Sequence, residues 1–311
     1  MRWVSRLVTV ALAVSLSTTA TAADDVKLQL KWIPQFQFAG YYVAHDKGYY
    51  SDADLDVSIQ PGGVDVSSMQ MVASGSAQFG IASPDQIFLT RDKGLKTKGL
   101  MSAFQYSPTM LMVKKDSGIE APKDFPGHTA GISFGELTEI EYRQILSEAG
   151  VDSSEINEIK KQYNLSRFLN DQVEIFSGYI TNEPYQAEQE GAEVRTFQGK
   201  EFGVEFYGDT LVAKTEYIEE NPKLVRRFVD ASRRGWAYAM LNPDETIEIL
   251  SKYSDKKKDA LEYEADTTIP LLKSEKSLAH GFGWQEEDRY DYTQRKLKEA
   301  GLVDELVDVE T

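Results

Sequence analysis

Short strand-like segments alternate with helix-like segments along most of this chain, and that alternation limits the folds open to it. Residues 55–60 (LDVSIQ) alternate apolar and polar side chains, and a Pro-Gly-Gly turn follows them. We predict a helix over residues 64–75 with Asp65 as its N-cap, a strand over residues 77–83, and a second helix with Ser83 as its N-cap. Repeated strand–helix units of this kind predict an α/β fold, with mainly parallel sheets flanked by helices.

Two segments are expected to carry the chain between lobes. Residues 109–119 and residues 203–218 each contain a strand beside a Gly-marked turn, and a compact α/β block lies between them. We therefore predict a discontinuous first lobe of residues 23–116 and 207–311, and a second lobe of residues 117–206. A cleft between two lobes is a common place for a small-molecule site.

The first residues predict export of the chain. A basic start (MRWVSR) precedes a short apolar run and the small-residue sequence Ala20-Thr21-Ala22. These are the parts of a secretory signal peptide, and the apolar run is shorter than the roughly 20 residues of a membrane-spanning helix. We predict a signal peptide over residues 1–22, cleaved after Ala22, and a periplasmic mature protein. Because the chain contains no Cys, its stability must come from a substantial core.

Charge and missing motifs exclude several functional classes. The formal net charge is −16, whereas binding to nucleic acid or anionic lipid depends on basic surfaces. The three His residues are far apart, and the sequence has no G-x-S-x-G elbow, Walker loop or H-E-x-x-H motif. We therefore expect a monomeric binder of a small molecule rather than an enzyme, without a metal or a cofactor.

Polar and aromatic residues recur where predicted strands end. The first group belongs to the aromatic string KWIPQFQFAGYY, whose front is expected to reach a ligand while its later rings begin a helix and pack into the core. Ligands of α/β sheets gather outside the carboxyl ends of strands, although Ser83 is explained equally well as a helix cap. The candidate ligand-binding residues are Trp32, Pro34, Gln35, Phe36, Phe38, Ser83, Asp85, Gln86, Tyr106, Phe134, Gly135, Glu136, Glu183, Tyr207 and Asp209.

Four segments carry a resemblance to a known family. They are KWIPQFQFAGYYVAHDKGYYSDADLDVSIQPGG, QYSPTMLMVKKDSGI, GYITNEPY and EFYGDTLVAK. In order and spacing they resemble the substrate-binding-protein family that includes thiamine-pyrimidine-precursor binders and the fungal pyrimidine precursor synthases. The resemblance covers essentially the whole mature chain. It implies a two-lobed, type II periplasmic-binding fold that closes on a small ligand and delivers it to the membrane-embedded permease and ATPase of an ABC importer.

The resemblance also implies roles for particular residues. Trp32 resembles the aromatic residues that sandwich a pyrimidine ring, Glu183 the acidic residue that faces ligand donors, and Asp209 a hinge-side carboxylate. In the synthase branch a lysine holds pyridoxal phosphate beside a histidine and a cysteine cluster. Those two positions fall on Ala82 and Gln86 here and Cys is absent, so the resemblance argues against synthase activity and against that cofactor.

The sequence therefore favours a periplasmic binder of an aminopyrimidine thiamine precursor, with alternatives left open. The same fold could bind another small organic solute, such as a flavin, nitrate or an alkyl sulfonate. The candidate residues include carboxylates but no Lys or Arg, which disfavours the two anions. A further alternative is a ligand-sensing partner of a membrane signalling protein.

Overall fold

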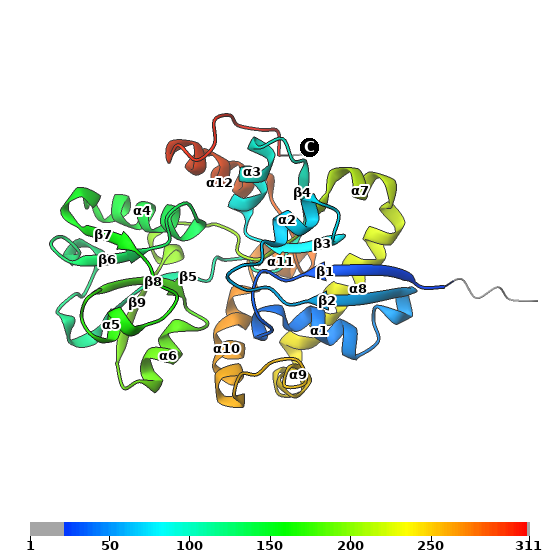
Figure 1. The fold of residues 1–311 in the computed structure, drawn as a ribbon, viewed down its shortest axis with the longest axis horizontal. Coiled ribbons are helices and arrows are strands. Elements are labelled where there is room, and N and C mark those ends of the chain that lie inside the picture. The colour runs from blue at the N-terminus through cyan, green and yellow to red at the C-terminus, as the bar shows by residue number, and fades with distance from the viewer. Residues whose placement is uncertain (1–21, 310–311) are drawn as a thin grey trace, which may run out of the picture.

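The computed structural model describes residues 22–309, which form two five-stranded sheets on opposite sides of Figure 1. The predicted signal peptide lies outside the described residues, apart from Ala22. The strands of the first sheet, in spatial order, are β2 (Leu55–Gln60), β1 (Asp24–Gln29), β3 (Phe79–Ala82), β10 (Thr210–Lys214) and β4 (Thr97–Ser102). Those of the second sheet are β7 (Asn157–Lys160), β6 (Thr129–Ile132), β8 (Ile175–Tyr179), β5 (Thr109–Lys114) and β9 (Val194–Gln198).

Both sheets are mainly parallel, as expected, and each contains one strand that runs in the opposite direction. β1 pairs in parallel with β2 and β3, and β6 pairs in parallel with β7 and β8. β10 and β5 are antiparallel to both of their neighbours. The register explains this, because Thr210 lies opposite Ala82 and Thr109 lies opposite Tyr179. β10 and β5 thus each enter a sheet at the end where the parallel strands finish, and so run in the opposite direction.

The chain passes between the sheets twice. The first passage lies between β4 and β5, over residues 103–108, and the second between β9 and β10, over residues 199–209. The second passage contains the lobe boundary expected at residues 206/207. The first precedes the boundary expected at residues 116/117, since β5 is hydrogen-bonded within the second sheet. The residue boundaries of the two lobes stay a prediction, with the first boundary moved toward residue 103.

Helices flank both sheets. Near the second sheet are α4 (Leu137–Ala149), α5 (Ser166–Leu169) and α6 (Glu183–Gln189). The other helices are α1 (Ala39–Asp46), α2 (Ser68–Ala73), α3 (Pro84–Asp92), α7 (Thr215–Glu220), α8 (Pro222–Leu241), α9 (Pro243–Leu250), α10 (Lys258–Leu271), α11 (Glu275–His280) and α12 (Glu287–Glu299). Single 3-10 turns occur at Phe36–Phe38, Ser51–Ala53, Lys115–Ser117, Pro122–Asp124, Ser153–Glu155 and Gly199–Phe202. Within residues 22–309 no helix has the length and apolar character needed to cross a bilayer.

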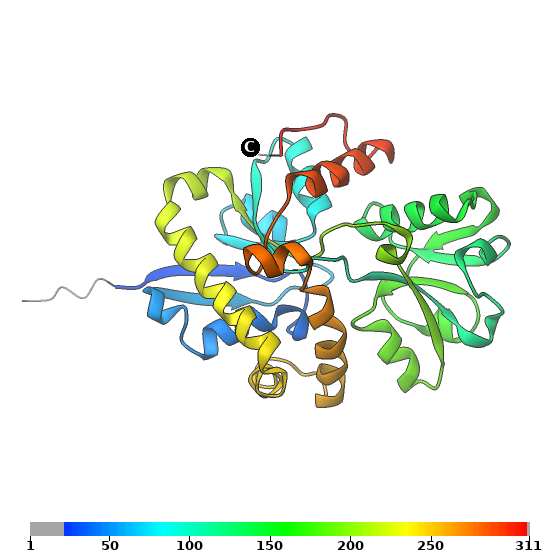
Figure 2. The ribbon, with the colours of Figure 1, turned by 180° about the vertical axis from the view of Figure 1, so that it is seen from behind.

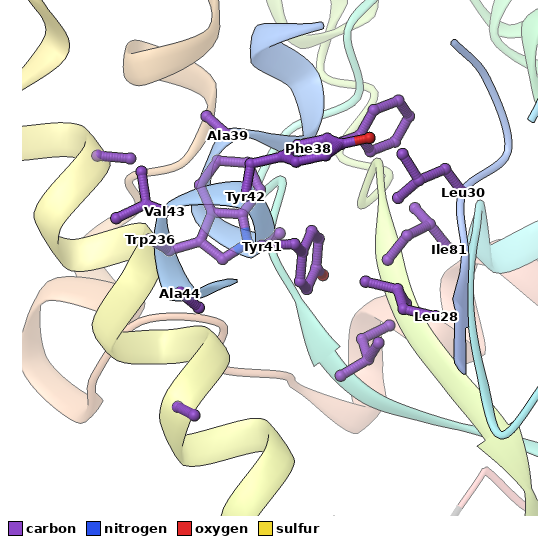
Figure 3. Close-up of a cluster of buried hydrophobic side chains, with 14 of the residues drawn as sticks. Leu28, Leu30, Phe38, Ala39, Tyr41, Tyr42, Val43, Ala44, Ile81 and Trp236 are labelled. Atoms are coloured by element: carbon purple, nitrogen blue, oxygen red, sulfur yellow. The ribbon is translucent and has the colours of Figure 1, made fainter. Parts of the chain in front are cut away.

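The largest core lies between the first sheet and helices α1 and α8, where α8 crosses in front of the sheet in Figure 2. Figure 3 shows Trp236 of α8 against Tyr41 and Ala44 of α1, and the rings of Trp236 and Tyr41 meet edge to face with centroids 5.7 Å apart. The two helices approach closely because each has a glycine at the contact. A Cβ on Gly40 would lie 2.1 Å from the Trp236 ring, and one on Gly235 would lie 2.0 Å from the Gly40 carbonyl oxygen.

Helix starts near the cleft follow local capping chemistry. Ser83 is the N-cap of α3 and Pro84 its first residue, which confirms the predicted start. Asp65 is not the N-cap of α2, which begins at Ser68 after the N-cap Ser67, whose hydroxyl accepts from the Gln70 N–H at 3.3 Å. The expected first turn of this helix is instead a tight turn, in which the Val66 N–H donates to the Gly63 carbonyl.

Candidate functional site

A cleft of about 620 Å³ lies between the two sheets. One wall consists of segments that follow β1, β2 and β3, and the other of segments that follow β6, β7 and β8. These strands run in parallel within their sheets, so six carboxyl ends face one cleft. Ligands of open α/β sheets bind at such ends, and small-molecule sites span roughly 300–1,000 Å³. The cleft therefore has the position and size of a ligand site.

Two aromatic rings face each other across the cleft. Trp32 follows β1 and is partly buried, while Tyr163 follows β7 and is 66% exposed. Their centroids are 6.1 Å apart and their planes are inclined by 31°. Each wall thus contributes one π-face to the space between them.

Lys31, the residue before Trp32, connects the two walls. Its ammonium forms an ion pair with Asp209 and donates to the Tyr179 hydroxyl at 3.1 Å. Burial alone would lower the pKa of Lys31, but Asp209 and Tyr179 together raise it above the ordinary value. Burial also raises the pKa of Tyr179 to about 12. At neutral pH Lys31 is therefore charged and Tyr179 is a neutral hydroxyl.

Two further lysines line the cleft, and each is also paired with a carboxylate. Lys256 pairs with Glu264, and Lys161 lies 3.6 Å from a carboxylate oxygen of Glu183. The other Glu183 oxygen accepts from the Tyr179 N–H at 2.8 Å. These lysines correct the premise, drawn from the sequence, that the site has no cationic residues. Because all three are paired, the residues that line the cleft still offer no free cation to an anionic ligand.

A chain of side-chain amides runs from Asp209 to the cleft. The Gln37 amide NH₂ donates to Asp209 at 2.7 Å, and the Gln35 amide NH₂ donates to the Gln37 amide oxygen. The Gln35 amide oxygen is buried and has no hydrogen-bond partner. Gln35 and Gln37 both line the cleft.

Three carboxyl groups line the cleft without an ion pair, namely Asp65, Asp85 and Glu136. Asp85, in the first turn of α3, is 2% exposed, and its Oδ1 has no hydrogen-bond partner. Burial raises the pKa of Asp85, although the Ser83 hydroxyl and the charge of Lys31 act against that rise. Glu136, at the start of α4 on the opposite wall, is exposed to the open cleft. Partial desolvation by the surrounding protein, together with the charge of Asp85, raises the pKa of Glu136.

The structure brings about half of the candidate residues together. Those that line the cleft are Trp32, Gln35, Ser83, Asp85, Gln86, Glu136 and Glu183. Those that do not are Pro34, Phe36, Phe38, Tyr106, Phe134, Gly135, Tyr207 and Asp209.

The candidates outside the cleft lining have identifiable positions. Phe36 and Phe38 are fully buried, because the 3-10 turn at Phe36–Phe38 directs both rings into the core. Tyr207 is fully buried beneath the Arg289 guanidinium, and Tyr106 packs beside the same guanidinium. Asp209 is buried behind Lys31.

The remaining three of these candidates lie beside lining residues. The Pro34 carbonyl accepts from the Ser254 hydroxyl at 2.7 Å. Phe134 is 45% exposed, and the Gly135 N–H donates to Glu139 at 2.7 Å.

Sequence reasoning missed several cleft residues. Lys31, Gln37, Tyr179 and Asn182 lie inside the quoted family segments, so their position after strands was an available signal. Lys161 and Tyr163 follow β7 in the same way, and a rule covering every parallel strand end would have included them. Lys256 lies between α9 and α10, and no sequence pattern places that loop at the cleft. The missed residues lie on both walls.

The pyridoxal phosphate of the synthase branch does not fit these residues. Ala82 ends β3 and Gln86 lies in α3, and neither side chain can form a Schiff base. Lys31, a cleft lysine on the same wall, is held in its ion pair with Asp209. Among residues 22–309 no cluster of His, Asp and Glu could hold a metal ion.

Comparisons with known proteins agree with this architecture. The chain is 28% identical to the riboflavin-binding protein RibY of Chloroflexus aurantiacus, covering 92% of this chain and 84% of the relative. It is 24% identical to the formylaminopyrimidine-binding protein of Halalkalibacterium halodurans, covering 88% and 86%. It is also 24% identical to a Legionella pneumophila protein named 4-amino-5-hydroxymethyl-2-methylpyrimidine phosphate synthase, covering 91% and 89%.

Among solved structures, the periplasmic aliphatic sulphonate binding protein SsuA from Escherichia coli matches with a TM-score of 0.75 at 15% identity, covering 92% of this chain and 96% of that one. This likeness confirms the two-lobed periplasmic-binding fold that the sequence predicted. The NMT1/THI5-like family matches over residues 35–246, a span that includes most of the cleft residues. The chain therefore belongs to the NMT1/THI5-like family.

Proposed function

We propose that this protein is a periplasmic solute-binding protein that captures an aminopyrimidine thiamine precursor and delivers it to an ABC importer. The observation that carries the proposal is the Trp32–Tyr163 pair, which places one aromatic face on each wall of the cleft. The family and the formylaminopyrimidine-binding relative support this ligand class. We infer transport from the binding-protein fold and from the predicted signal peptide.

The two rings suit a flat ligand. A ring sandwiched between Trp32 and Tyr163 needs a separation of about 7–8 Å, because each contact between carbon layers takes roughly 3.5–4.0 Å. The present separation is 6.1 Å, so a small outward movement of the exposed Tyr163 makes room. Each stacked pair contributes about 0.5–1.5 kcal/mol beyond area burial, so directional hydrogen bonds must supply the rest of the affinity.

Division of the site between two walls couples binding to closure. A ligand held by Trp32 alone gains nothing when the lobes approach. A ligand that also meets Tyr163 and Glu136 gains contacts that exist only when the walls are close. A ligand shifts a conformational equilibrium only through such differential contacts, so the bound protein favours the closed state.

A flavin is the second candidate. The specific observation in its favour is the cleft volume of about 620 Å³, which exceeds what a single pyrimidine ring fills, together with the 28% identical riboflavin-binding relative. The same aromatic pair would then stack on a larger ring system. Catalysis is not part of the proposal, because Ala82 and Gln86 stand where the resemblance places the cofactor-binding lysine and the histidine.

The test is a titration of the mature chain with a ligand panel. Calorimetry would use 4-amino-5-hydroxymethyl-2-methylpyrimidine, formylaminopyrimidine, riboflavin, nitrate and an alkyl sulfonate. We expect a pyrimidine to bind most tightly, and Trp32→Ala to weaken its binding about tenfold or more, which corresponds to about 1.4 kcal/mol.

The matched control for that variant is Trp284→Ala. Trp284 is a partly exposed tryptophan that stacks on His280 and does not line the cleft, so its loss should leave affinity unchanged. Tight binding of the sulfonate or nitrate with no pyrimidine binding would refute the proposal. Preferential binding of riboflavin would favour the second candidate instead.

A further inference from the structure

The first wall of the cleft presents hydrogen-bond acceptors that have no donor. The Gln35 Oε1, Asp85 Oδ1 and Gln86 Oε1 atoms are buried and unpartnered, and all three residues line the cleft. We call these residues the acceptor wall. Buried polar atoms normally have partners, and leaving one unpaired costs about 1–3 kcal/mol, or more for a charged group. Three such atoms on one wall therefore need a common explanation.

The polarity of this wall is set from inside the protein. Asp209 can only accept hydrogen bonds once it is ionised in its pair with Lys31, so Gln37 must turn its NH₂ group toward it. The Gln37 oxygen then accepts from the Gln35 NH₂ group, which leaves the Gln35 oxygen as the free end of the chain. An amide that could offer either a donor or an acceptor is thereby held as an acceptor.

Helix capping does not explain Asp85. An acidic residue in the first turn of α3 is favourable at a helix N-terminus, and the Ser83 hydroxyl and nearby backbone N–H groups act to lower the pKa of Asp85. Yet Oδ1 stays unpartnered at 2% exposure. The cleft lysines are engaged by Asp209, Glu183 and Glu264, so none of them forms an ion pair with Asp85. A donor from a bound molecule would satisfy this oxygen.

We propose that the acceptor wall determines the specificity of the site, with Asp85 accepting a hydrogen bond from an N–H group on the edge of a planar heterocycle. This inference rests on the proposed function and adds the hydrogen-bond polarity of the ligand. The selected edge carries an N–H donor, as an exocyclic amine or a ring N–H does. An edge with only acceptors, or an anionic group, leaves the wall unsatisfied and is rejected.

Glu136 extends the same selection to the second wall. It is another lining carboxyl group without an ion pair, and it lies on the wall opposite Asp85, whose charge acts on it. Two carboxylates that approach each other on closure repel, unless a donor-bearing ligand lies between them. The ligand that satisfies Asp85 thus also permits the walls to close.

The test uses two matched pairs of probes that differ by one donor. The first pair is 4-amino-5-hydroxymethyl-2-methylpyrimidine and its analogue with a methyl group in place of the 4-amino group. The second pair is riboflavin and 3-methylriboflavin. Calorimetry on the wild-type protein shows which pair binds. Within that pair, the member with the N–H donor should bind at least about tenfold more tightly than its methylated analogue.

Asp85→Ala removes the acceptor and should reduce that preference to about threefold or less. Asp85→Asn is the conservative companion, because it keeps the shape and a neutral acceptor and should retain an intermediate preference. Asp56→Ala, a charge removal at an exposed position on β2 outside the cleft, should leave the preference intact. Thermal unfolding of each variant establishes whether it is folded. If Asp85→Ala does not fold, the donor preference of Asp85→Asn alone tests the proposal.

The two proposals fail in different ways. Equal affinity for both members of a binding pair, or an undiminished preference in the folded Asp85 variants, overturns the acceptor wall and leaves the proposed function standing. If no member of either pair binds, the proposed function fails, and the inference fails with it.

Discussion

Glu141 is a buried carboxyl group whose replacement by glutamine should change how stability depends on pH. It lies on α4 at 3% exposure, near the Ser107 hydroxyl of the first passage between the sheets and the Thr109 hydroxyl at the start of β5. Its Oε1 has no partner. Burial raises the pKa of Glu141 from 4.5 to about 7, although the two hydroxyls act to lower it.

The sign and size of the effect follow from that shift. Below pH 4.5 the carboxyl is protonated in both the folded and the unfolded chain, and above pH 7 it is ionised in both. Between these limits the folded chain binds a proton that the unfolded chain has released, so stability falls as pH rises. At 1.36 kcal/mol per pKa unit, the loss between pH 4.5 and 7 is about 3 kcal/mol.

Glu141→Gln removes the titration while keeping the shape and the hydroxyl contacts. We therefore expect the variant to gain stability over the wild type as pH rises, by about 3 kcal/mol between pH 4 and 8. The assay is urea unfolding followed by tryptophan fluorescence at several pH values. Unfolding transitions followed by circular dichroism should coincide with those followed by fluorescence, which establishes that unfolding is cooperative.

The control is Glu148→Gln on the same helix, where the side chain is exposed. It removes the same charge from a solvated position and should change stability by less than about 0.5 kcal/mol at any pH. A difference between Glu141→Gln and the wild type that stays constant from pH 4 to 8 would show that Glu141 does not carry the shifted pKa, and would refute the reasoning.

Two further substitutions test how the site is held. Gly62→Ala should lower both the melting temperature and ligand affinity, because its Cβ would lie 2.4 Å from the Lys31 carbonyl carbon and displace the turn that holds Trp32. Gly63→Ala, with open space at the Cβ, should leave the melting temperature unchanged in a parallel measurement. Lys31→Met should cost about 3–5 kcal/mol in urea unfolding, because it leaves Asp209 buried and uncompensated. Adding Asp209→Asn should recover part of that loss, and full additivity of the two changes would contradict the pairing.

The sequence predicted the parts of the site that follow from strand ends. Trp32 follows the alternating strand β1 and Asp85 follows the short apolar strand β3, and both line the cleft. The same rule could not separate Trp32 from Phe36, four residues later. The 3-10 turn at Phe36–Phe38 decides that Phe36 points into the core, and no periodicity in so short a segment reveals it.

Long-range pairing was the part that the sequence could not supply. Glu183 was expected to face ligand donors, and it does line the cleft, but its oxygens are occupied by Lys161 and by the Tyr179 N–H. Asp209 was expected to be a hinge-side carboxylate; it ends the second passage between the sheets, where it is buried behind Lys31. The partner of each carboxylate is a lysine whose strand-end position indicates a place at the cleft but not which carboxylate it pairs with, so the free and the occupied carboxylates looked alike.

The paired lysines explain how a cleft with three cations can still discriminate against anions. An anionic ligand would have to draw Lys31 away from Asp209, or Lys256 away from Glu264, and each of these carboxylates is at most 3% exposed. Breaking a buried pair costs about 3–5 kcal/mol, which is comparable to what two charge-assisted hydrogen bonds to the new ligand return. A ligand that donates hydrogen bonds avoids that cost, because Asp85 and the Gln35 oxygen are already free to accept. We therefore infer that the lysines act as internal counter-ions that fix the polarity of the walls, and that the unpaired carboxyl groups select the ligand.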